Sequence, residues 1–402
     1  MHRPGCTLLR RFRAILAAGV LAATVGGCGS VVPGDAVRAE PDLADLDVGN
    51  YPTAPLAYGT AADEDAARYR EAQRLGDFVA LPLEADPAFV TRLMGMGGPV
   101  VLDRRDMQSL VINDTFDEVA SELVAGWVHT WSTGGEVDTS QQMSIAVLMF
   151  PDAATAESVA IGLEHDDFTF NTDNRPVQLT KYSHSKAHWR PGTTSLGSWT
   201  GHDRYVTYIK YNDFSGKADL PAMVQRTEAL LDIQLPLLDE FEPTPAEQLN
   251  DVDLDPDNVL ALTLPKAESL IATTGPAGAF RGRGALYALN GIESLEFLDQ
   301  GQVSAIGLAE SVVMRSDSVQ GAEALLSHFN PTTDPTGSTP IGIPDGIDSG
   351  QVHCYSRKLE EHERRPSNFC LFQTGKFFAQ VEGSQIQDLH QKTSAQYALL
   401  AK

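Results

Sequence analysis

The spacing of hydrophobic and polar residues predicts strands and helices in alternation along the chain. Residues 143–150 form a run of strand length that is apolar apart from Ser144, and residues 204–211 alternate between two faces as a strand does. Apolar residues three and four positions apart predict helices over 151–163 and 221–238. Similar patterns predict strands at 77–83 and 177–182, and helices at 61–75, 88–94 and 116–127.

The second half of the chain repeats this order. A predicted strand at 309–314 is followed by a helix at 316–329, as the strand at 143–150 is followed by its own helix. Two strands linked by a turn at Thr374-Gly375 then precede a closing helix at 384–400. We interpret this as an ancient duplication of one unit. The predicted fold class is α+β, with two similar domains, each an antiparallel sheet with helices packed on one face.

Segments rich in proline and acidic residues mark the domain boundaries. Prolines recur through residues 28–60, which predicts an extended tether, because Pro-rich spacers extend by ~3 Å per residue. Residues 240–265 break the periodicity and predict an acidic, Pro-rich linker. The predicted organisation is a leader at 1–27, a tether at 28–60, a first α+β domain at 61–239, the linker at 240–265 and a second α+β domain at 266–402.

The first 27 residues have the pattern of a signal peptide. Arginines at positions 3, 10, 11 and 13 precede an apolar run that is shorter than the ~20 residues of a membrane span. The run ends in Val25-Gly-Gly-Cys28, which resembles a bacterial lipobox. By that resemblance, cleavage would make Cys28 the N-terminal residue, with lipid on its sulfur and its amine. A plain secretory peptide is the alternative, and the small residues and cysteine placed directly after the apolar run favour the lipoprotein.

The charge of the chain limits its partners. Acidic residues number 54 against 30 basic ones, which gives a formal net charge of −24. Nucleic acids and anionic lipid surfaces bind to basic patches, so neither is an expected partner. The lipid on Cys28 is the expected contact with the membrane, and it places the protein on the outer face of the plasma membrane.

The remaining cysteines predict a disulfide. Cys6 leaves with the leader, so Cys354 and Cys370 remain in the exported body. They lie on predicted neighbouring strands at 351–356 and 368–373, in a compartment where disulfides persist. The alternative is a zinc site, but two isolated sulfurs supply only half of a zinc shell. We expect a Cys354–Cys370 disulfide.

The linker contains a candidate calcium loop. Aspartates occupy alternate positions from Asp251 to Asp257. An EF-hand loop needs glycine at its sixth position and glutamate at its twelfth, where a loop starting at Asp251 has Pro256 and Leu262. We therefore interpret the run as a solvated acidic linker.

Two other motifs also suggest sites. Gly278-Ala-Phe-Arg-Gly-Arg-Gly284 is similar to a phosphate cradle, but no apolar strand precedes it and no Gly-Lys-Ser/Thr follows it. We interpret it as a turn with two exposed arginines. His184 and His188 stand four apart, but the flanking Pro191-Gly192 does not favour a helix that would align them on a metal. We expect no metal and no cofactor.

Aromatic residues gather in the first domain. Core packing accounts for most of them, and a minority could line a groove for an apolar or sugar ligand. No Gly-x-Ser-x-Gly or His-Glu-x-x-His motif is present, and no catalytic residue is predicted. The aromatic residues are Trp127, Trp131, Trp189, Trp199, Tyr182, Tyr205, Tyr208 and Tyr211.

Six short segments resemble a family of lipoproteins of unknown function from actinobacteria such as Nocardia and Rhodococcus. The resemblance spans nearly the whole mature chain, and it implies two similar α+β domains on a lipid anchor. It supplies no catalytic or ligand-binding residues. The segments are Leu46-Asp-Val-Gly-Asn-Tyr-Pro-Thr53, Leu81-Pro-Leu-Glu-Ala-Asp-Pro87, Phe150-Pro-Asp-Ala-Ala-Thr-Ala156, Phe241-Glu-Pro-Thr-Pro245, Leu262-Thr-Leu-Pro265 and Lys392-Thr-Ser-Ala-Gln-Tyr397.

These features favour a non-enzymatic binding or scaffolding lipoprotein of the cell envelope, with a lipid, a glycan or a protein as its ligand. One alternative is a cell-wall hydrolase or transferase that uses carboxylates. Another is the solute-binding protein of a transporter, whose parallel-sheet lobes are not suggested by these hairpin-like strand pairs.

The lipobox leads to a direct prediction. Replacement of Cys28 by serine removes the sulfur that would carry the lipid, so we expect Cys28→Ser to move the protein from the membrane fraction to the soluble fraction. Fractionation of cells followed by immunoblotting measures this. Retention of the variant in membranes would contradict the anchor.

Overall fold

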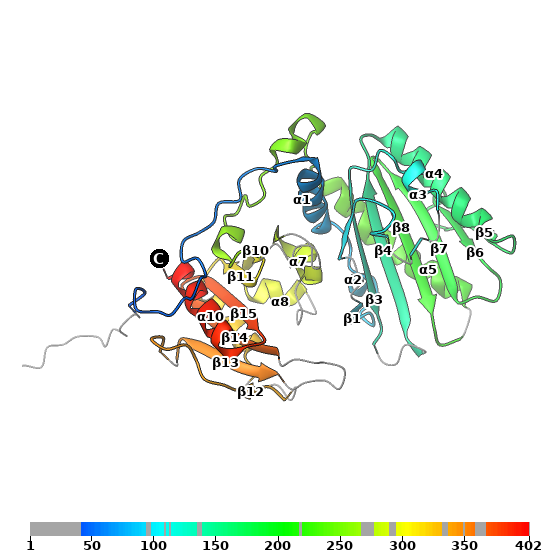
Figure 1. Ribbon diagram of the computed structural model, residues 1–402. Coiled ribbons are helices and arrows are strands. Elements are labelled where there is room, and N and C mark those ends of the chain that lie inside the picture. Colours follow the sequence, from blue (N-terminus) through cyan, green and yellow to red (C-terminus); the bar gives the residue numbers. More distant parts are fainter. Residues whose placement is uncertain are drawn as a thin grey trace, which may run out of the picture. The chain divides into compact units, whose positions relative to one another are not determined.

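The described residues form two antiparallel sheets with helices against them (Figure 1). The computed structural model describes residues 42–93, 98–107, 110–111, 114–134, 139–216, 219–266, 277–288, 295–331, 337–348, 350–357 and 367–401. The leader, Cys28 and the start of the predicted tether lie outside these residues. Among the helices within them, none combines the length and the apolar character that a membrane crossing requires.

The first sheet contains eight strands. Its central strand β4 (Gln141–Met149) pairs with β3 (Ala125–Ser132) on one side and with β8 (Tyr205–Asp213) on the other. The spatial order is β1-β3-β4-β8-β7-β6-β5, and β2 pairs with β3. The other strands are β1 (Thr91–Leu93), β2 (Val100–Val101), β5 (Arg175–Val177), β6 (Lys186–Trp189) and β7 (Ser195–His202).

The second sheet has seven strands in the order β12-β13-β14-β15-β11-β10-β9. They are β9 (Gly278–Phe280), β10 (Val303–Leu308), β11 (Ser311–Ser316), β12 (Thr339–Pro340), β13 (Val352–Arg357), β14 (Ser367–Thr374) and β15 (Phe377–Gly383). Read from the other edge, this order is β9-β10-β11-β15-β14-β13-β12. Each strand then corresponds in place and in chain order to one strand of the first sheet, whose order is β1-β3-β4-β8-β7-β6-β5. The predicted repeat of one α+β unit is therefore present in the connectivity, and the α+β class is confirmed.

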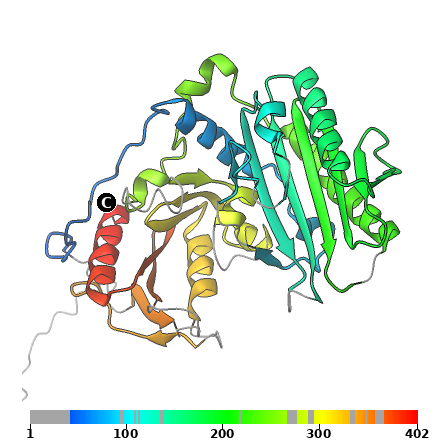
Figure 2. The ribbon, with the colours of Figure 1, turned by 45° about the vertical axis from the view of Figure 1, so that its right-hand side comes forward.

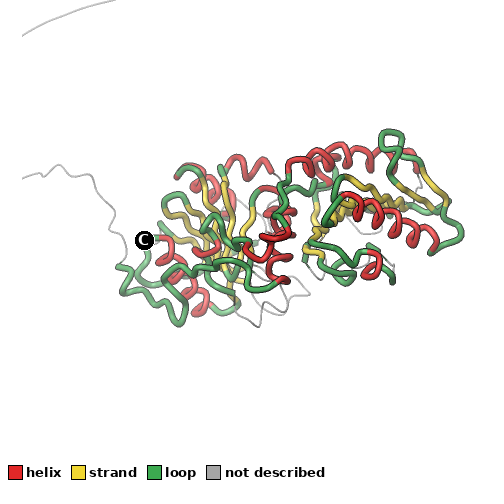
Figure 3. The backbone as a smooth tube through the Cα atoms, turned by 90° about the horizontal axis from the view of Figure 1, so that it is seen from above, coloured by secondary structure: helices red, strands yellow, loops and turns green. Residues whose placement is uncertain are grey.

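Helices cover both faces of each sheet, whereas we expected them on one face (Figures 2 and 3). In the first domain, Tyr208 packs in the cluster that contains α4 (Ala153–Thr169), and the next residue, Ile209, packs in the cluster that contains α5 (Leu220–Glu240). Neighbouring strand residues point to opposite faces, so the two helices lie on opposite sides. The nearly continuous apolar run at 143–150 is what such double burial requires.

The second domain repeats this two-sided arrangement. The helix α9 (Val319–Phe329) packs on the face that presents Met314 and Phe378, and α10 (Ile386–Leu400) packs on the face that presents Val313 and Ala379. Both domains thus bury most residues of a central strand, β4 in the first and β11 in the second.

Three predicted elements around the start of the first domain differ from the structure: one helix is shifted, and two segments have another secondary structure. The helix α1 runs from Glu64 to Gly76 and begins later than expected, because the Asp63 side chain accepts the N–H of Ala66 as its N-cap. The segment 77–83, predicted as a strand, forms turns and enters α2 (Pro82–Ala85). The predicted helix at 88–94 contains β1 instead.

Two further assignments in the first domain differ. The predicted helix at 116–127 is only one turn long, α3 (Phe116–Val119), and its last three residues belong to β3. Trp127 and Trp131 follow earlier apolar residues at the spacing of a helix, but both are buried on one face of the strand β3. The strand predicted at 177–182 is wrong beyond Val177, which is the last residue of β5. Tertiary packing overrides local spacing in these segments.

The described part of the predicted tether is packed rather than free. Leu46 is buried in the core cluster of the second domain. The Tyr51 hydroxyl donates to Asp388 of α10 at 2.6 Å, and the Leu56 N–H donates to the Ala261 carbonyl at 3.2 Å. Residues 42–60 therefore belong to the folded body, and an extended tether is left as a prediction only for residues before them.

A disulfide joins two neighbouring strands of the second domain. Cys354 on β13 and Cys370 on β14 are directly paired in register, with their Cα atoms 4.1 Å apart and their sulfurs bonded at 2.03 Å. Both residues are buried on the face that α10 covers. The bond cross-links β13 to β14.

Removal of this bond is expected to weaken the fold. The double variant Cys354→Ala/Cys370→Ala should lose about 3 kcal/mol of unfolding free energy, because the cross-link no longer restricts the unfolded chain. Urea unfolding without reductant measures the difference. With reductant present, the variant and the original chain should unfold at nearly the same urea concentration, and an equal midpoint without reductant would contradict the prediction.

Candidate functional site

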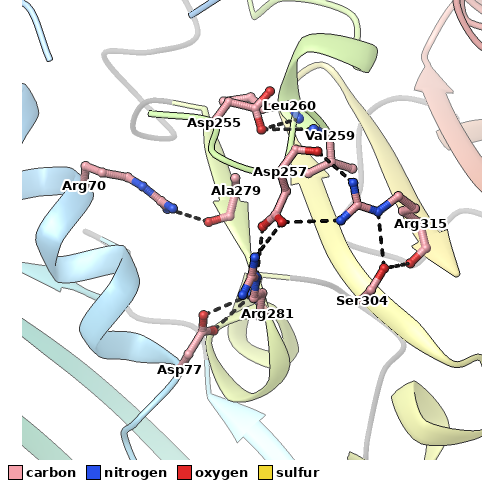
Figure 4. A network of polar contacts seen from close by, with 10 residues as sticks. All are labelled: Arg70, Asp77, Asp255, Asp257, Val259, Leu260, Ala279, Arg281, Ser304 and Arg315. Atoms are coloured by element: carbon pink, nitrogen blue, oxygen red, sulfur yellow. Dashed lines mark hydrogen bonds and ion pairs between the residues drawn. The ribbon is translucent and has the colours of Figure 1, made fainter. Parts of the chain in front are cut away.

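The linker aspartates and the Gly-Arg segment, two motifs that the sequence singled out, meet in one polar network (Figure 4). The Arg281 guanidinium donates to the Asp257 carboxylate, with Nε at 2.9 Å and Nη2 at 2.5 Å. Arg315 of β11 donates to the same carboxylate from Nη2 at 3.3 Å. The pKa of Asp257 is lowered by its bonds and charge contacts with these two arginines, against the opposing effect of burial.

Asp255 is a buried cap rather than a solvated acid. Only 6% of its surface is exposed, and its carboxylate accepts the N–H groups of Val259, Leu260 and Ala261 at 2.7–3.0 Å. These bonds satisfy the backbone at the start of the short turn η3 (Leu260–Leu262). Asn258, just before that turn, adopts a left-handed backbone with φ of 52°. The interpretation of this run as a solvated linker is therefore wrong at Asp255 and Asp257.

The helix α1 joins the same network from the first domain. The Arg70 guanidinium is buried and donates to the Ala279 carbonyl at 2.6 Å. Asp77, just after the helix, accepts the N–H of Arg281 at 3.1 Å and the N–H of Gly284 at 3.1 Å. Burial raises the pKa of Asp77 to about 8, although these N–H donors and two nearby arginines act to lower it.

The Gly-Arg segment is thus a structural junction. It forms β9 and the helix α7 (Gly282–Ala288) rather than an exposed turn. Its N–H donors, which would face a phosphate, are occupied by Asp77, and Arg283 binds Glu84 of α2 at 2.7 Å. Among the described residues, no group of three or more histidine, cysteine or acidic side chains could hold a metal ion.

A separate pocket of about 340 Å³ lies in the first domain, where the C-terminal end of α4 meets β6, β7 and β8. This volume is at the lower end of the range of small-molecule sites, roughly 300–1,000 Å³. Gly197 of β7 keeps the floor open, because a side chain there would extend from a Cβ that already lies 3.4 Å from the Tyr208 hydroxyl. Its described lining residues are Asp167, Phe170, Asn171, Asn174, His188, Trp189, Arg190, Thr193, Thr194, Ser195, Gly197, Tyr208 and Lys210.

Asp167 is the carboxylate of this pocket and is held by aromatic neighbours. The Trp199 indole N–H donates to its Oδ2 at 3.2 Å, and the His188 Nε2 lies 3.7 Å from the same oxygen. The other nitrogen of His188 lies 3.6 Å from Glu164, one turn earlier on α4. The Trp199 ring is itself stacked on Tyr208, with ring centroids 4.1 Å apart. Aromatic packing therefore fixes the position of the carboxylate.

Lys210 of β8 brings an ammonium group to the same pocket. Its Nζ donates to the Leu110 carbonyl at 3.3 Å, and the Tyr208 hydroxyl donates to the same oxygen at 3.4 Å. Burial lowers the pKa of Lys210, and the negative charge of Asp167 partly opposes this. The chain thus keeps a desolvated cation in a cavity, which costs stability and is typical of binding or catalytic positions.

Chemically, the pocket is suited to binding through hydrogen bonds and through the charges of Asp167, Arg190 and Lys210. A glycosidase-type mechanism needs two carboxylates on opposite sides of the scissile bond. The described lining supplies one, Asp167. His184, by contrast, is exposed and outside this lining, so the sequence-predicted His184–His188 pair does not converge on one site.

Sequence reasoning found part of this pocket. Trp189 and Tyr208 belong to the aromatic set from which a groove was expected, and His188 was noted for its spacing from His184. Asp167 and Lys210 were missed, because they are 43 positions apart along the chain. The one available signal for the pocket was Lys210 itself, a charged residue within the largely apolar strand β8 on the face toward α4.

The high pKa of Asp77 predicts a dependence of stability on pH. An unfolded aspartate titrates near pH 4, so between about pH 4 and pH 8 the folded chain retains a proton that the unfolded chain has lost. The contribution of Asp77 is therefore fully present below about pH 4 and is lost by about pH 8. Asp77→Asn cannot lose a proton and keeps an amide oxygen for the two N–H donors, so its unfolding free energy should fall less over this range.

Urea unfolding at pH 5 and pH 8 measures this difference. Asp299→Asn, at an exposed position on α8 (Leu295–Gln300), is the control and should leave the pH dependence unchanged. A parallel pH dependence in the Asp77→Asn variant and the original chain would contradict the assignment.

Comparisons with solved structures give weak likenesses. The extracellular domain of PknH from Mycobacterium tuberculosis has 12% sequence identity, with 42% of this chain and 96% of that chain covered and a TM-score of 0.30. The di-domain ARO/CYC BexL from the BE-7585A biosynthetic pathway has 10% identity, with 87% and 97% covered and a TM-score of 0.16. Neither likeness carries an argument about function. No curated protein matches the chain.

Family models cover most of the sequence. The model described as Domain of unknown function (DUF7373) N-terminal matches residues 58–254, and the model described as Domain of unknown function (DUF7373) C-terminal matches residues 259–402. These two ranges correspond to the two sheets and meet inside the acidic linker. The chain therefore belongs to the two-domain DUF7373 family, whose function is unknown.

Proposed function

We propose that this protein is an exported lipoprotein, anchored through Cys28 to the outer face of the plasma membrane, that binds a small polar ligand of the cell envelope. The observation that carries the binding function is the pocket between α4 and strands β6–β8. Its carboxylate and ammonium groups are positioned by packing rather than by each other, so both are available to a ligand. The anchor is supported by the lipobox resemblance alone.

The two alternative functions receive less support. A hydrolase or transferase using paired carboxylates would need a second acid in the pocket lining, where the described residues supply only Asp167. A transporter's solute-binding protein would have parallel-sheet lobes, and every strand pair in the described residues is antiparallel. Ligand binding without chemistry is the function that this geometry favours.

Native mass spectrometry of the full chain, purified from its own cells in mild detergent, tests the proposal. We expect a bound small molecule on a fraction of the protein. Gly197→Val should abolish this added mass, because the new side chain occupies the pocket floor while a β-branched residue suits a strand.

Gln380→Val is the matched control. It places the same side chain at a partly exposed position of β15 in the second domain, away from the pocket, and should retain the ligand. Ligand-free protein, or a ligand that survives Gly197→Val, would count against the proposed function.

A further inference from the structure

The pocket contains two basic side chains that form no ion pair with any side chain that the structure describes, although the negative charge of Asp167 in the same lining acts on one of them, Lys210. Lys210 and Arg190 both line it, and within the described residues neither makes an ion pair. By contrast, Arg226 in the first domain forms an ion pair with Asp86, and Arg283 in the second domain forms an ion pair with Glu84. The unpaired cations of the pocket are therefore available to an external anion.

Their hydrogen-bond donors are largely unused. The Lys210 ammonium has three donors and gives one to the Leu110 carbonyl, which leaves two. Arg190 is exposed, and its planar guanidinium suits a carboxylate or a phosphate, to which it can give two parallel bonds. Together they can hold one anionic group at the pocket.

The neutral polar residues of the lining present both donors and acceptors. The Asn174 side-chain nitrogen donates to the Phe168 carbonyl at 2.9 Å, which leaves its oxygen as an acceptor. The Asn171 side-chain oxygen accepts the N–H of Asp173 at 2.9 Å, which leaves its nitrogen as a donor. Ser195 adds a hydroxyl. Hydroxyl groups donate and accept at once, so this mixture matches a polyhydroxylated ligand.

Flat aromatic surfaces complete the lining. The Trp189 indole is half-buried and held in place by its N–H, which donates to the Thr193 carbonyl at 2.8 Å. Phe170, at the end of α4, is 68% exposed and also lines the pocket. Rigid aromatic faces pack against the C–H faces of a saturated ring at low entropic cost.

We infer that this pocket binds a small polyhydroxylated ligand bearing one anionic group, namely a sugar phosphate or a sugar acid. Lys210 and Arg190 bind the anionic group, Asn171, Asn174 and Ser195 bind hydroxyls, and Trp189 packs against the ring. A volume of about 340 Å³ suits one or two rings. The inference rests on the proposed binding function and specifies its ligand class.

Isothermal titration calorimetry with the full chain in detergent tests the ligand class. Four probes separate its parts: glucose 6-phosphate, glucuronate, glucose and inorganic phosphate. We expect at least one of the two charged sugars to bind at least tenfold tighter than both glucose and inorganic phosphate, because only the charged sugars use both parts of the pocket. Equal affinity for glucose and the charged sugars, or no binding of either charged sugar, would overturn the inference.

Variants locate the binding. Lys210→Met and Arg190→Met should each weaken the binding of the charged sugar at least tenfold and leave glucose binding unchanged, with the melting temperature measured to establish folding. Arg190 is exposed, so its replacement tests the site even where Lys210→Met alters packing. Lys186→Met, an exposed β6 position outside the lining, is the matched control. Unchanged affinity in both Arg190→Met and Lys210→Met would overturn the inference.

The ligand captured by native mass spectrometry separates this inference from the proposed function. A neutral or cationic molecule that disappears with Gly197→Val would uphold the binding function and reject the anionic class. A captured sugar phosphate or sugar acid would support both. An empty protein that also fails to bind all four probes would overturn both.

Discussion

One tryptophan, Trp127 of β3, connects the hydrophobic cores of the two domains. Its ring lies against Gly76 at the end of α1, so closely that a Cβ on Gly76 would be 2.7 Å from the ring. Its other neighbours include Phe280 of β9 in the second domain, with ring centroids 6.3 Å apart. Residues of both domains therefore belong to one continuous buried cluster. The rest of the fold depends on this contact, because it sets how closely α1 approaches both sheets.

The polar junction beside this core explains the placement of the acidic linker. Asp255 satisfies backbone N–H groups that would otherwise be buried without partners, and Asp257 accepts hydrogen bonds from Arg281 and Arg315. Such groups are costly when unpaired, so the linker is fixed in one conformation rather than solvated. A chain with a large excess of acids uses several of them as internal hydrogen-bond acceptors. The net charge of the sequence therefore overstates how much negative charge is free on the surface.

The two copies of the duplicated unit have diverged at the position of the pocket. In the first domain, strands β6–β8 and the end of α4 leave a cavity above Gly197 and Lys210. In the second domain, the corresponding strands and the end of α9 fill this space with aromatic rings: Phe329 stacks on Phe378 at 5.0 Å, and Tyr355 lies 5.6 Å from Phe369. The first unit thus has a pocket at this position, and the second has packed aromatic rings there and a disulfide between β13 and β14.

The sequence by itself determined the duplicated α+β layout and the buried strand at 143–150. It also determined the helices α4, α5 and α10 and the pairing of the two cysteines. These depend on local periodicity, which short windows of sequence record. Tertiary structure decided the rest. Residues 77–83 and 116–127 took their secondary structure from the neighbours that bury them. Asp255 became a cap because the backbone around it is buried. Asp167 and Lys210 line the same pocket only because α4 packs across β8. Such contacts join residues far apart along the chain, and no local pattern encodes them.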